Sequence, residues 1–176
     1  MKNELRQKAK NIRKTLNTKV LSNLIYAKLI TLPEYKKSKN ICTYYSFRDE
    51  VITENYFEDK TKNWFIPKMD GENLAVCPYD ENKIEIHKYN IKEPKTTPIN
   101  PEIIDLIIVP ALAADKNGYR IGYGKGYYDR LLKKIPNTKK IIILFSDLLF
   151  DNIFPDSHDE KCDIIITDEK IHRINC

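Results

Sequence analysis

The sequence has little glycine, no long apolar run and no closely spaced cysteine pair. No stretch approaches the ~18 apolar residues of a membrane-spanning helix, so we expect no membrane partner. The first residues, Met-Lys-Asn-Glu-Leu-Arg, lack the apolar core of a secretory signal peptide, and we therefore expect a cytoplasmic protein. The four cysteines are scattered without a Cys-x-x-Cys pair, which argues against a disulfide framework or a zinc site.

Positive charge is concentrated at the N-terminus. Residues 1–40 contain 11 lysines or arginines and two glutamates, a net charge of +9, and the +5 of the whole chain leaves −4 for the rest. Such a segment can bind nucleic acid, form a solvated helix face or attract an anionic small molecule. A basic nucleic-acid-binding module remains an alternative, but no RNA- or DNA-binding motif accompanies the charge, so we expect no nucleic-acid partner.

The length and the hydrophobic pattern predict one domain over residues 1–176 with an α/β fold. Continuous apolar runs at 105–110 and 140–145 indicate buried parallel strands that alternate with helices. We expect three layers, helix–sheet–helix, around a mainly parallel, mixed sheet of Rossmann-like type. The pattern further predicts one helix over about 2–31, a helix at about 53–60, strands at 40–45, 64–68, 74–77 and 84–87 (the last two paired with each other), and a final strand at 162–167.

Four of the five glycines lie in one short segment, at positions 118, 122, 124 and 126. This segment carries Lys125 and connects the strand at 105–110 to a predicted helix at 127–134. Backbone N–H groups of a glycine loop and the N-terminus of a helix together bind anions, so we predict a phosphate-binding loop. The spacing matches neither a Walker A loop nor the dinucleotide fingerprint. A sugar-phosphate isomerase-like enzyme remains a second alternative.

The same residues resemble a known family. Asp105-Leu-Ile-Ile-Val-Pro110, Asp115 and Gly118-Tyr-Arg-Ile-Gly-Tyr-Gly-Lys-Gly-Tyr-Tyr-Asp-Arg130 are similar to the 5-formyltetrahydrofolate cyclo-ligase (methenyltetrahydrofolate synthetase) family. The resemblance extends over nearly the whole chain, through Lys2-Asn-Glu-Leu-Arg6, Glu50-Val-Ile-Thr53 and His158-Asp159. Two departures from the family pattern are Asn90, where glycine is expected, and Ala114, where a bulkier phenylalanine is common.

The resemblance implies a reaction and its participants. In the presence of Mg²⁺, the family converts 5-formyltetrahydrofolate and ATP to 5,10-methenyltetrahydrofolate, ADP and phosphate. The γ-phosphoryl group is transferred to the formyl oxygen, N10 attacks the activated carbon, and phosphate leaves. We further expect a monomer, and we expect the basic N-terminal segment to favour polyglutamylated folates.

The resemblance also implies roles for individual residues. The catalytic residues are Lys125 and Arg120. The ATP-binding residues are Lys2, Arg6, Arg120, Gly122, Tyr123, Gly124, Lys125, Gly126, Tyr127 and Tyr128. The substrate-binding residues are Glu50, Tyr45, Tyr123 and Tyr127, where the Glu50 carboxylate accepts hydrogen bonds from the pterin. The metal ligands are Asp129 and Asp159, and we assign no ligand role to His158.

Overall fold

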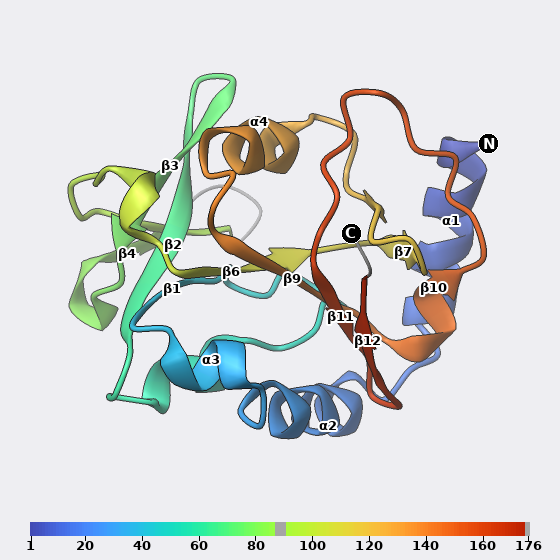
Figure 1. Ribbon diagram of the computed structural model, residues 1–176, viewed down its shortest axis with the longest axis horizontal. Helices are drawn as coiled ribbons and strands as arrows, with labels where there is room; N and C mark the ends of the chain where they lie inside the picture. The colour runs from blue at the N-terminus through green and yellow to red at the C-terminus, as the bar shows by residue number, and fades with distance from the viewer. Residues whose placement is uncertain (87–90, 175–176) are drawn as a thin grey trace.

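The main sheet lies at the centre of the computed structural model, which describes residues 1–86 and 91–174 (Figure 1). Within these ranges the sheet has seven strands in the order β12-β11-β9-β6-β1-β2-β3. They are β1 (Asn40–Cys42), β2 (Asn63–Asp70), β3 (Asn73–Pro78), β6 (Leu106–Pro110), β9 (Lys139–Ile143), β11 (Ile164–Ile166) and β12 (Ile171–Arg173). The five inner strands run parallel, and β3 and β12 are antiparallel at the two edges. The prediction of a mainly parallel, mixed sheet is confirmed.

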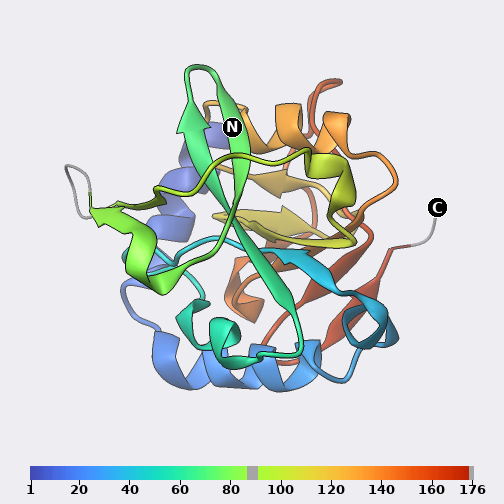
Figure 2. The ribbon, with the colours of Figure 1, turned by 90° about the vertical axis from the view of Figure 1, so that its left-hand side faces the viewer.

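Helices cover both faces of this sheet. They are α1 (Lys2–Arg13), α2 (Thr18–Leu29), α3 (Pro33–Lys37) and α4 (Tyr127–Lys134). Helix α4 lies on one face and α2 and α3 on the other, with α1 at one end (Figures 1 and 2). The predicted three-layer arrangement is therefore confirmed. None of the helices in the described part of the chain has the length and apolarity needed to cross a bilayer.

Smaller elements flank the main sheet. A three-stranded sheet contains β7 (Ala113–Asp115), β8 (Arg120–Ile121) and β10 (Leu149–Phe150), and a two-stranded one contains β4 (Ile84–Ile86) and β5 (Lys92–Pro94). Short 3₁₀ helices cover Glu54–Glu58, Glu81–Lys83, Pro101–Ile103 and Ser146–Leu148. The first of these replaces the longer helix predicted at 53–60.

The core is built on the two central apolar strands. In β6 the residues from Leu106 to Val109 are completely buried, and in β9 Ile141, Ile142 and Ile143 are at most 1% exposed. A parallel strand that is covered on both faces needs apolar side chains pointing both ways, which explains the continuous apolar runs. The prediction of two central strands at these positions is confirmed.

The single helix predicted over residues 2–31 is wrong. The chain forms α1 and α2 instead, and the Asn17 side chain begins α2 by accepting a hydrogen bond from the Val20 N–H at 3.3 Å. The apolar stripe changes face at this break, because Val20 and Leu24 are 52% and 45% exposed while Ile25 is completely buried. The two helices pack against different strands, α1 against β7 and α2 against β11. A straight helix could not reach both.

Two details of the predicted strands also need correction. The strand at 74–77 pairs with β2, and the strand at 84–86 pairs with β5, so these two strands are not each other's partners. The 3₁₀ helix Glu81–Lys83 turns the chain away from the main sheet between them. The strand predicted to be the last is followed by β12. His87 and Asn90, on which the sequence analysis commented, lie outside the described residues.

Candidate active site

A cleft of about 780 Å³ lies at the carboxyl edge of the main sheet. Strands β1 and β6 are neighbours, and the segments that follow their carboxyl ends meet there, as is usual for ligand sites in parallel sheets. The first turn of α1, the glycine loop (Gly118–Gly126) and the segment from Asp156 to Asp159 complete its walls. Every residue that the resemblance assigns to the site lines this cleft: Lys2, Arg6, Tyr45, Glu50, Arg120, Gly122, Tyr123, Gly124, Lys125, Gly126, Tyr127, Tyr128, Asp129 and Asp159.

The start of the glycine loop is fixed by a tight turn. The Asp115 carboxylate accepts hydrogen bonds from the N–H groups of Asn117 (2.9 Å) and Tyr119 (3.2 Å). Gly118 has a φ of +93°, and a Cβ there would lie 2.6 Å from the carbonyl oxygen of Cys162. Glycine is therefore required by both backbone conformation and close approach. Ala114, one of the two departures from the family pattern, is completely buried in β7.

The end of the glycine loop presents an anion-binding arrangement. Gly126, with φ of +64°, is the N-cap of α4, and no side chain caps this helix end. Lys125 is exposed beside it, and its ammonium makes no hydrogen bond or ion pair with any described residue. Free backbone N–H groups at a helix N-terminus attract anions, and Lys125 adds a full positive charge. The predicted strand–loop–helix geometry is confirmed.

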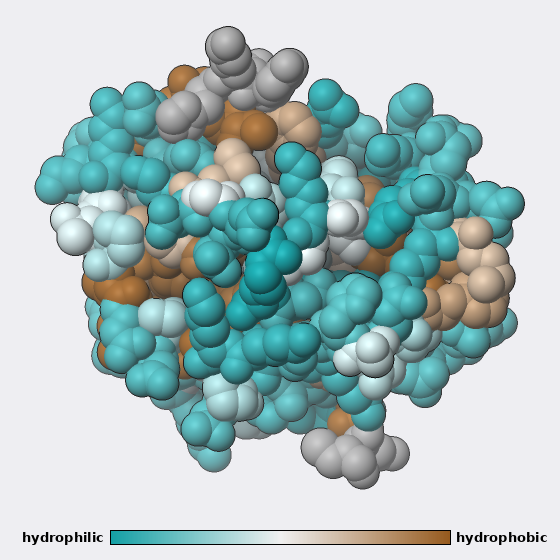
Figure 3. All heavy atoms as spheres, turned by 90° about the horizontal axis from the view of Figure 1, so that it is seen from above, coloured by the Kyte–Doolittle hydropathy of each residue, from teal (hydrophilic) through white to brown (hydrophobic). Residues whose placement is uncertain are grey.

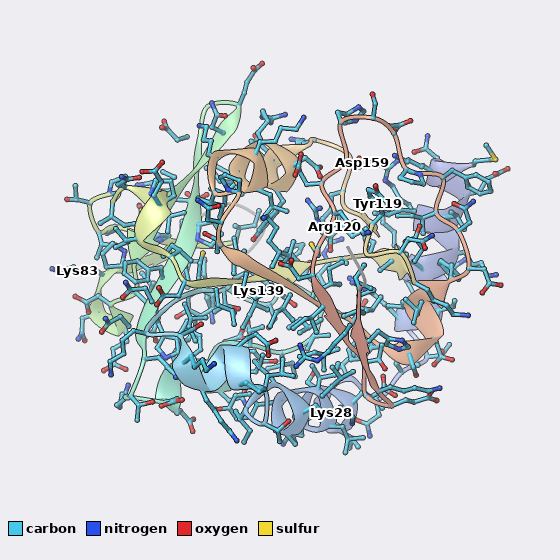
Figure 4. The ribbon with its side chains drawn as sticks, in the orientation of Figure 1. Lys28, Lys83, Tyr119, Arg120, Lys139 and Asp159 are labelled. Carbon is cyan, nitrogen blue, oxygen red and sulfur yellow. The ribbon has the colours of Figure 1, made fainter. Side chains whose placement is uncertain are left out.

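The Arg120 side chain is buried beneath the glycine loop and is not exposed on its surface. Its side chain is 4% exposed and lies 3.1 Å from the Asp129 carboxylate. It also donates to the Glu160 carbonyl at 3.3 Å, and the Glu160 N–H donates to Asp129 at 3.1 Å. This network fixes α4 against the segment before β11. Figure 4 shows Arg120 and Asp159 on the same side of the sheet, between α4 and α1.

The first two turns of α1 bring two further cations to the cleft. The Lys2 ammonium lies 2.6 Å from both Asp156 and Asp159. Partial burial lowers the pKa of Lys2, but its hydrogen bonds to these two carboxylates outweigh burial and raise the pKa overall. The Arg6 guanidinium donates to the Gly122 carbonyl at 3.0 Å. Helix α1 is thus attached to the glycine loop and to the 156–159 segment.

Glu50, from the segment after β1, forms a hydrogen-bonded pair with Tyr123 of the glycine loop. The Tyr123 hydroxyl donates to one Glu50 oxygen at 2.9 Å, and the Phe47 N–H donates to the other at 2.9 Å. Glu50 is 6% exposed, and burial raises the pKa of its carboxyl although both hydrogen bonds oppose this. Burial and the Glu50 charge raise the pKa of Tyr123 to about 12. The site thus contains a buried acceptor for N–H donors.

Aromatic rings line the cleft near this pair. Tyr45 packs against Phe57 and Tyr79 with ring centroids 5.3 and 6.1 Å away, and the Lys92 ammonium lies 5.0 Å from the Tyr45 ring centroid. The Tyr127 hydroxyl donates to the Gly71 carbonyl of the β2–β3 turn at 3.2 Å. The cleft therefore offers apolar ring faces next to the Glu50 carboxylate.

A group of potential metal ligands lies beside α1. Ligand atoms of Asp156, His158 and Asp159 lie within 4.8 Å of one another. Asp129 lines the same cleft but is not part of this group, and its carboxylate is paired with Arg120. Two carboxylates that can be completed by phosphate oxygens and waters suit Mg²⁺. The sequence motif indicates Asp159 but not Asp156.

Arg13 is a second residue that the sequence analysis did not identify. Its position four residues after Ala9 places it on the apolar face of α1, where a charged side chain is unusual. That position is the signal that could have found it. The guanidinium is buried and donates to the carbonyl of Ala111, directly after β6.

The fold and the cleft define an α/β protein in which an uncapped helix N-terminus with a loop lysine shares one cleft with a buried carboxylate. The face seen in Figure 3 is mainly hydrophilic, with smaller apolar patches between polar side chains.

A model of the 5-formyltetrahydrofolate cyclo-ligase family matches residues 1–168. The chain belongs to this family.

Individual relatives agree with the family match. The probable 5-formyltetrahydrofolate cyclo-ligase of Schizosaccharomyces pombe is 32% identical over 172 residues, covering 85% of this chain and 84% of the relative. The 5-formyltetrahydrofolate cyclo-ligase of Mus musculus is 30% identical over 169 residues, covering 84% of this chain and 82% of the relative. The NMR structure of Aquifex aeolicus 5,10-methenyltetrahydrofolate synthetase aligns with a TM-score of 0.89 at 33% identity, covering 99% of this chain and 93% of that one.

Proposed function

We propose that this chain catalyses the ATP-dependent cyclisation of 5-formyltetrahydrofolate to 5,10-methenyltetrahydrofolate, with release of ADP and phosphate. The observation that carries the proposal is that one cleft contains both a buried carboxylate and a loop lysine at a helix N-terminus, whose ammonium has no partner among the described residues. The membership of the chain in the cyclo-ligase family supports it. Neither a sugar-phosphate isomerase nor a nucleic-acid-binding module is supported by the matched proteins.

The Glu50 wall binds the folate. A pterin presents a row of N–H donors, and a carboxylate accepts two of them at once. Tyr123 and the Phe47 N–H orient the Glu50 carboxylate before the substrate arrives. Tyr45 supplies a ring face, and Tyr127 closes the cleft at the β2–β3 turn.

The glycine loop binds the phosphates of ATP. The N–H groups from Gly122 to Gly126 and the N-terminus of α4 surround the anion, and Lys125 neutralises the transferred group. Arg120 supports this wall from below, and Tyr128 packs near its guanidinium, 6.0 Å from the ring centroid. Lys2 and Arg6 close over the nucleotide from α1.

The chemistry requires activation of a formamide. Its carbon is a poor electrophile and its oxygen a poor leaving group. Transfer of the γ-phosphoryl group to the formyl oxygen solves both problems, after which N10 attacks the carbon and phosphate departs. The protein needs to supply mainly positioning and charge neutralisation, which the fixed cations and N–H groups of the cleft provide.

Mg²⁺ fits the acidic side of the cleft. We assign Asp129 and Asp159 as its carboxylates, and Asp156 and His158 extend the available donor set. These side chains would hold the ion, which would supply positive charge to neutralise the phosphates of ATP.

The proposal also covers the cellular location, the oligomeric state and the partners of the enzyme. We place it in the cytoplasm as a monomer with one domain over residues 1–176, without nucleic-acid or membrane partners. The free, buried thiols of Cys42, Cys77 and Cys162 suit a reducing compartment. The net charge of +9 in residues 1–40 favours folates with an anionic polyglutamate tail.

The direct test is a spectrophotometric assay with 5-formyltetrahydrofolate, Mg²⁺ and ATP. We expect the long-wavelength absorbance of the methenyl product to rise only when ATP is present. Absence of this rise, in protein that is folded and binds ATP, would show that the phosphate loop serves another substrate.

A further inference from the structure

The Arg130 side chain connects the turn of a β-hairpin to the glycine loop. Strands β2 and β3 form this hairpin, its two-residue turn is Gly71-Glu72, and β3 packs beside α4 (Figure 1). Arg130, in the first turn of α4, donates from Nε to the Glu72 carbonyl at 2.8 Å. Its Nη2 donates to the same carbonyl and, at 3.0 Å, to the carbonyl of Lys125. One guanidinium thus holds two backbone carbonyls from distant parts of the chain.

Neighbouring residues strengthen this connection. The Tyr127 hydroxyl donates to the Gly71 carbonyl at 3.2 Å, so both carbonyls of the hairpin turn accept hydrogen bonds from the start of α4. The Arg130 guanidinium lies 5.3 Å from the centroid of the Tyr127 ring. A Cβ on Gly126 would lie 3.0 Å from Arg130 Nη1, so the glycine leaves room for this guanidinium. The position of the Arg130 side chain is therefore set by contacts on several sides.

The hydrogen bond from Arg130 decides which way the peptide between Lys125 and Gly126 faces. This peptide is trans and planar, so its carbonyl and its N–H point in opposite directions. Lys125 and Gly126 line the cleft and Arg130 does not, so the carbonyl that Arg130 holds is directed away from the cleft. The Gly126 N–H is directed the opposite way, and it donates to no described residue. A carbonyl turned into the cleft would repel phosphate oxygens, whereas a free N–H attracts them.

We propose that Arg130 is a positioning residue for phosphate binding, which holds the Lys125 carbonyl outside the cleft and so presents the Gly126 N–H to the anion. The β2–β3 hairpin supports this arrangement, because its turn binds the same guanidinium. The proposal rests on the function proposed above, since it assumes that the phosphates of ATP bind at this loop. It assigns no contact between Arg130 and the nucleotide.

Positive charge alone would be a different reason for an arginine at this position. A lysine supplies the same charge, but its single ammonium lacks the planar fork of a guanidinium. The contacts of Arg130 use that fork, since Nε and Nη2 both donate to Glu72 and Nη2 also reaches Lys125. A comparison of arginine with lysine therefore separates positioning from charge.

The test compares Arg130→Met and Arg130→Lys with wild type. Lys134→Met is the matched control, because it removes an exposed cation from the same helix. The readouts are kcat, KM for ATP, KM for 5-formyltetrahydrofolate, and equilibrium binding of ATP without the folate. Hydrogen exchange of residues 70–73 and 122–128 is followed with and without ATP.

For Arg130→Met we expect KM for ATP to rise about tenfold and kcat to fall about tenfold, because the phosphate-binding groups lose their alignment. KM for the folate should stay within about twofold of wild type. Arg130→Lys should remain within about twofold of Arg130→Met in kcat/KM for ATP. ATP should slow hydrogen exchange at 122–128 in wild type and much less in Arg130→Met, and Lys134→Met should behave as wild type.

A folded Arg130→Met protein with wild-type affinity for ATP would overturn the proposal, even if residues 70–73 exchange faster, because Arg130 would then only hold the hairpin. Full recovery in Arg130→Lys would also overturn it, since charge alone would suffice. If Arg130→Met does not fold, Arg130→Lys decides: a wild-type KM for ATP in that variant rejects positioning. A wild-type protein that neither binds ATP nor forms the methenyl product rejects the proposed function itself, and this inference with it.

Discussion

The two sides of the cleft are held in place very differently. The glycine loop side is part of the core: Gly118 touches the backbone of Cys162, and Arg120 is buried against Asp129. The first two turns of α1 are held by partly buried polar contacts, namely Lys2 with two aspartates and Arg6 with one carbonyl of the loop. One side carries charges that are fixed in the core, and the other carries charges that are held by polar side-chain contacts.

The difference matches two needs of a phosphoryl-transfer site. Charge stabilisation works best when the groups are already in place, because no reorganisation is needed during reaction. Entry of ATP and exit of ADP need at least one wall that opens at small cost. We infer that the glycine loop supplies the first property and α1 the second. Substitutions on the two walls should therefore differ in their effects on turnover and stability.

Lys125→Ala should have the largest effect, because it removes the only exposed cation of the fixed wall. We expect kcat to fall by about 10³-fold, as for loss of a key charge-stabilising group. The melting temperature should not change, since the exposed ammonium has no protein partner in the described ranges. Lys133→Ala, an exposed lysine at the other end of α4, is the control. Loss of less than tenfold in folded Lys125→Ala would remove the loop lysine from the mechanism.

Asp129→Asn should destabilise the fixed wall. It leaves the buried Arg120 guanidinium without its counter-charge, and loss of one partner of a buried pair costs about 3 kcal/mol. Thermal unfolding should show a decrease of about 6–10 °C in melting temperature. Asp151→Asn, which breaks the exposed pair with Lys116, should leave it unchanged. Equal melting temperatures for the two variants would contradict the idea of a fixed wall.

Glu50→Gln should lower kcat/KM for the folate by about 10²-fold, because hydrogen bonds to a charged acceptor are lost. Its effect on stability should have the opposite sign. Burial raises the pKa of Glu50, so the folded state binds its proton more tightly than the unfolded state, and the wild type loses stability as pH rises through this range. The gain in stability of Glu50→Gln over wild type should thus be larger at pH 8 than at pH 5.

Urea unfolding at both pH values measures this difference. Glu58→Gln, an exposed glutamate in the following 3₁₀ helix, is the control and should show no pH-dependent gain. A constant difference between wild type and Glu50→Gln would mean that the carboxyl is not strained by burial.

The same division separates what the sequence can predict from what it cannot. The glycine loop and α4 can be predicted from local sequence, because the glycines, Lys125 and the helical pattern are next to one another in the chain. The break before Asn17 depends on two helices having to reach different strands. The pairing of β3 with β2 instead of β4 is equally non-local.

The candidate site shows the same limit. All the residues that the resemblance to the cyclo-ligases assigns to the site line one cleft in the structure. Their individual roles stay predictions. The sequence did not predict a role for Arg13, because hydrophobic periodicity identifies the apolar face of a helix and gives no reason for a charged residue on that face. The sequence did not predict a role for Asp156, because Lys2 and Asp156 are far apart in the chain and only the fold brings them together.

Lys2→Met should have the smallest effect, because one of its two partners, Asp156, is on the surface and its wall has to open. The exposed pair with Asp156 contributes at most about 1 kcal/mol and is screened by salt, and the pair with Asp159 is only partly buried. We expect KM for ATP to rise about fivefold at low ionic strength, with the difference from wild type shrinking at 1 M salt, and the melting temperature to change by less than about 2 °C. Lys10→Met, which replaces an exposed lysine of the same helix, serves as the control. A 10³-fold loss of kcat or a large drop in melting temperature would show that α1 is as firmly fixed as the glycine loop, and the two walls would then differ only in their distance from the core.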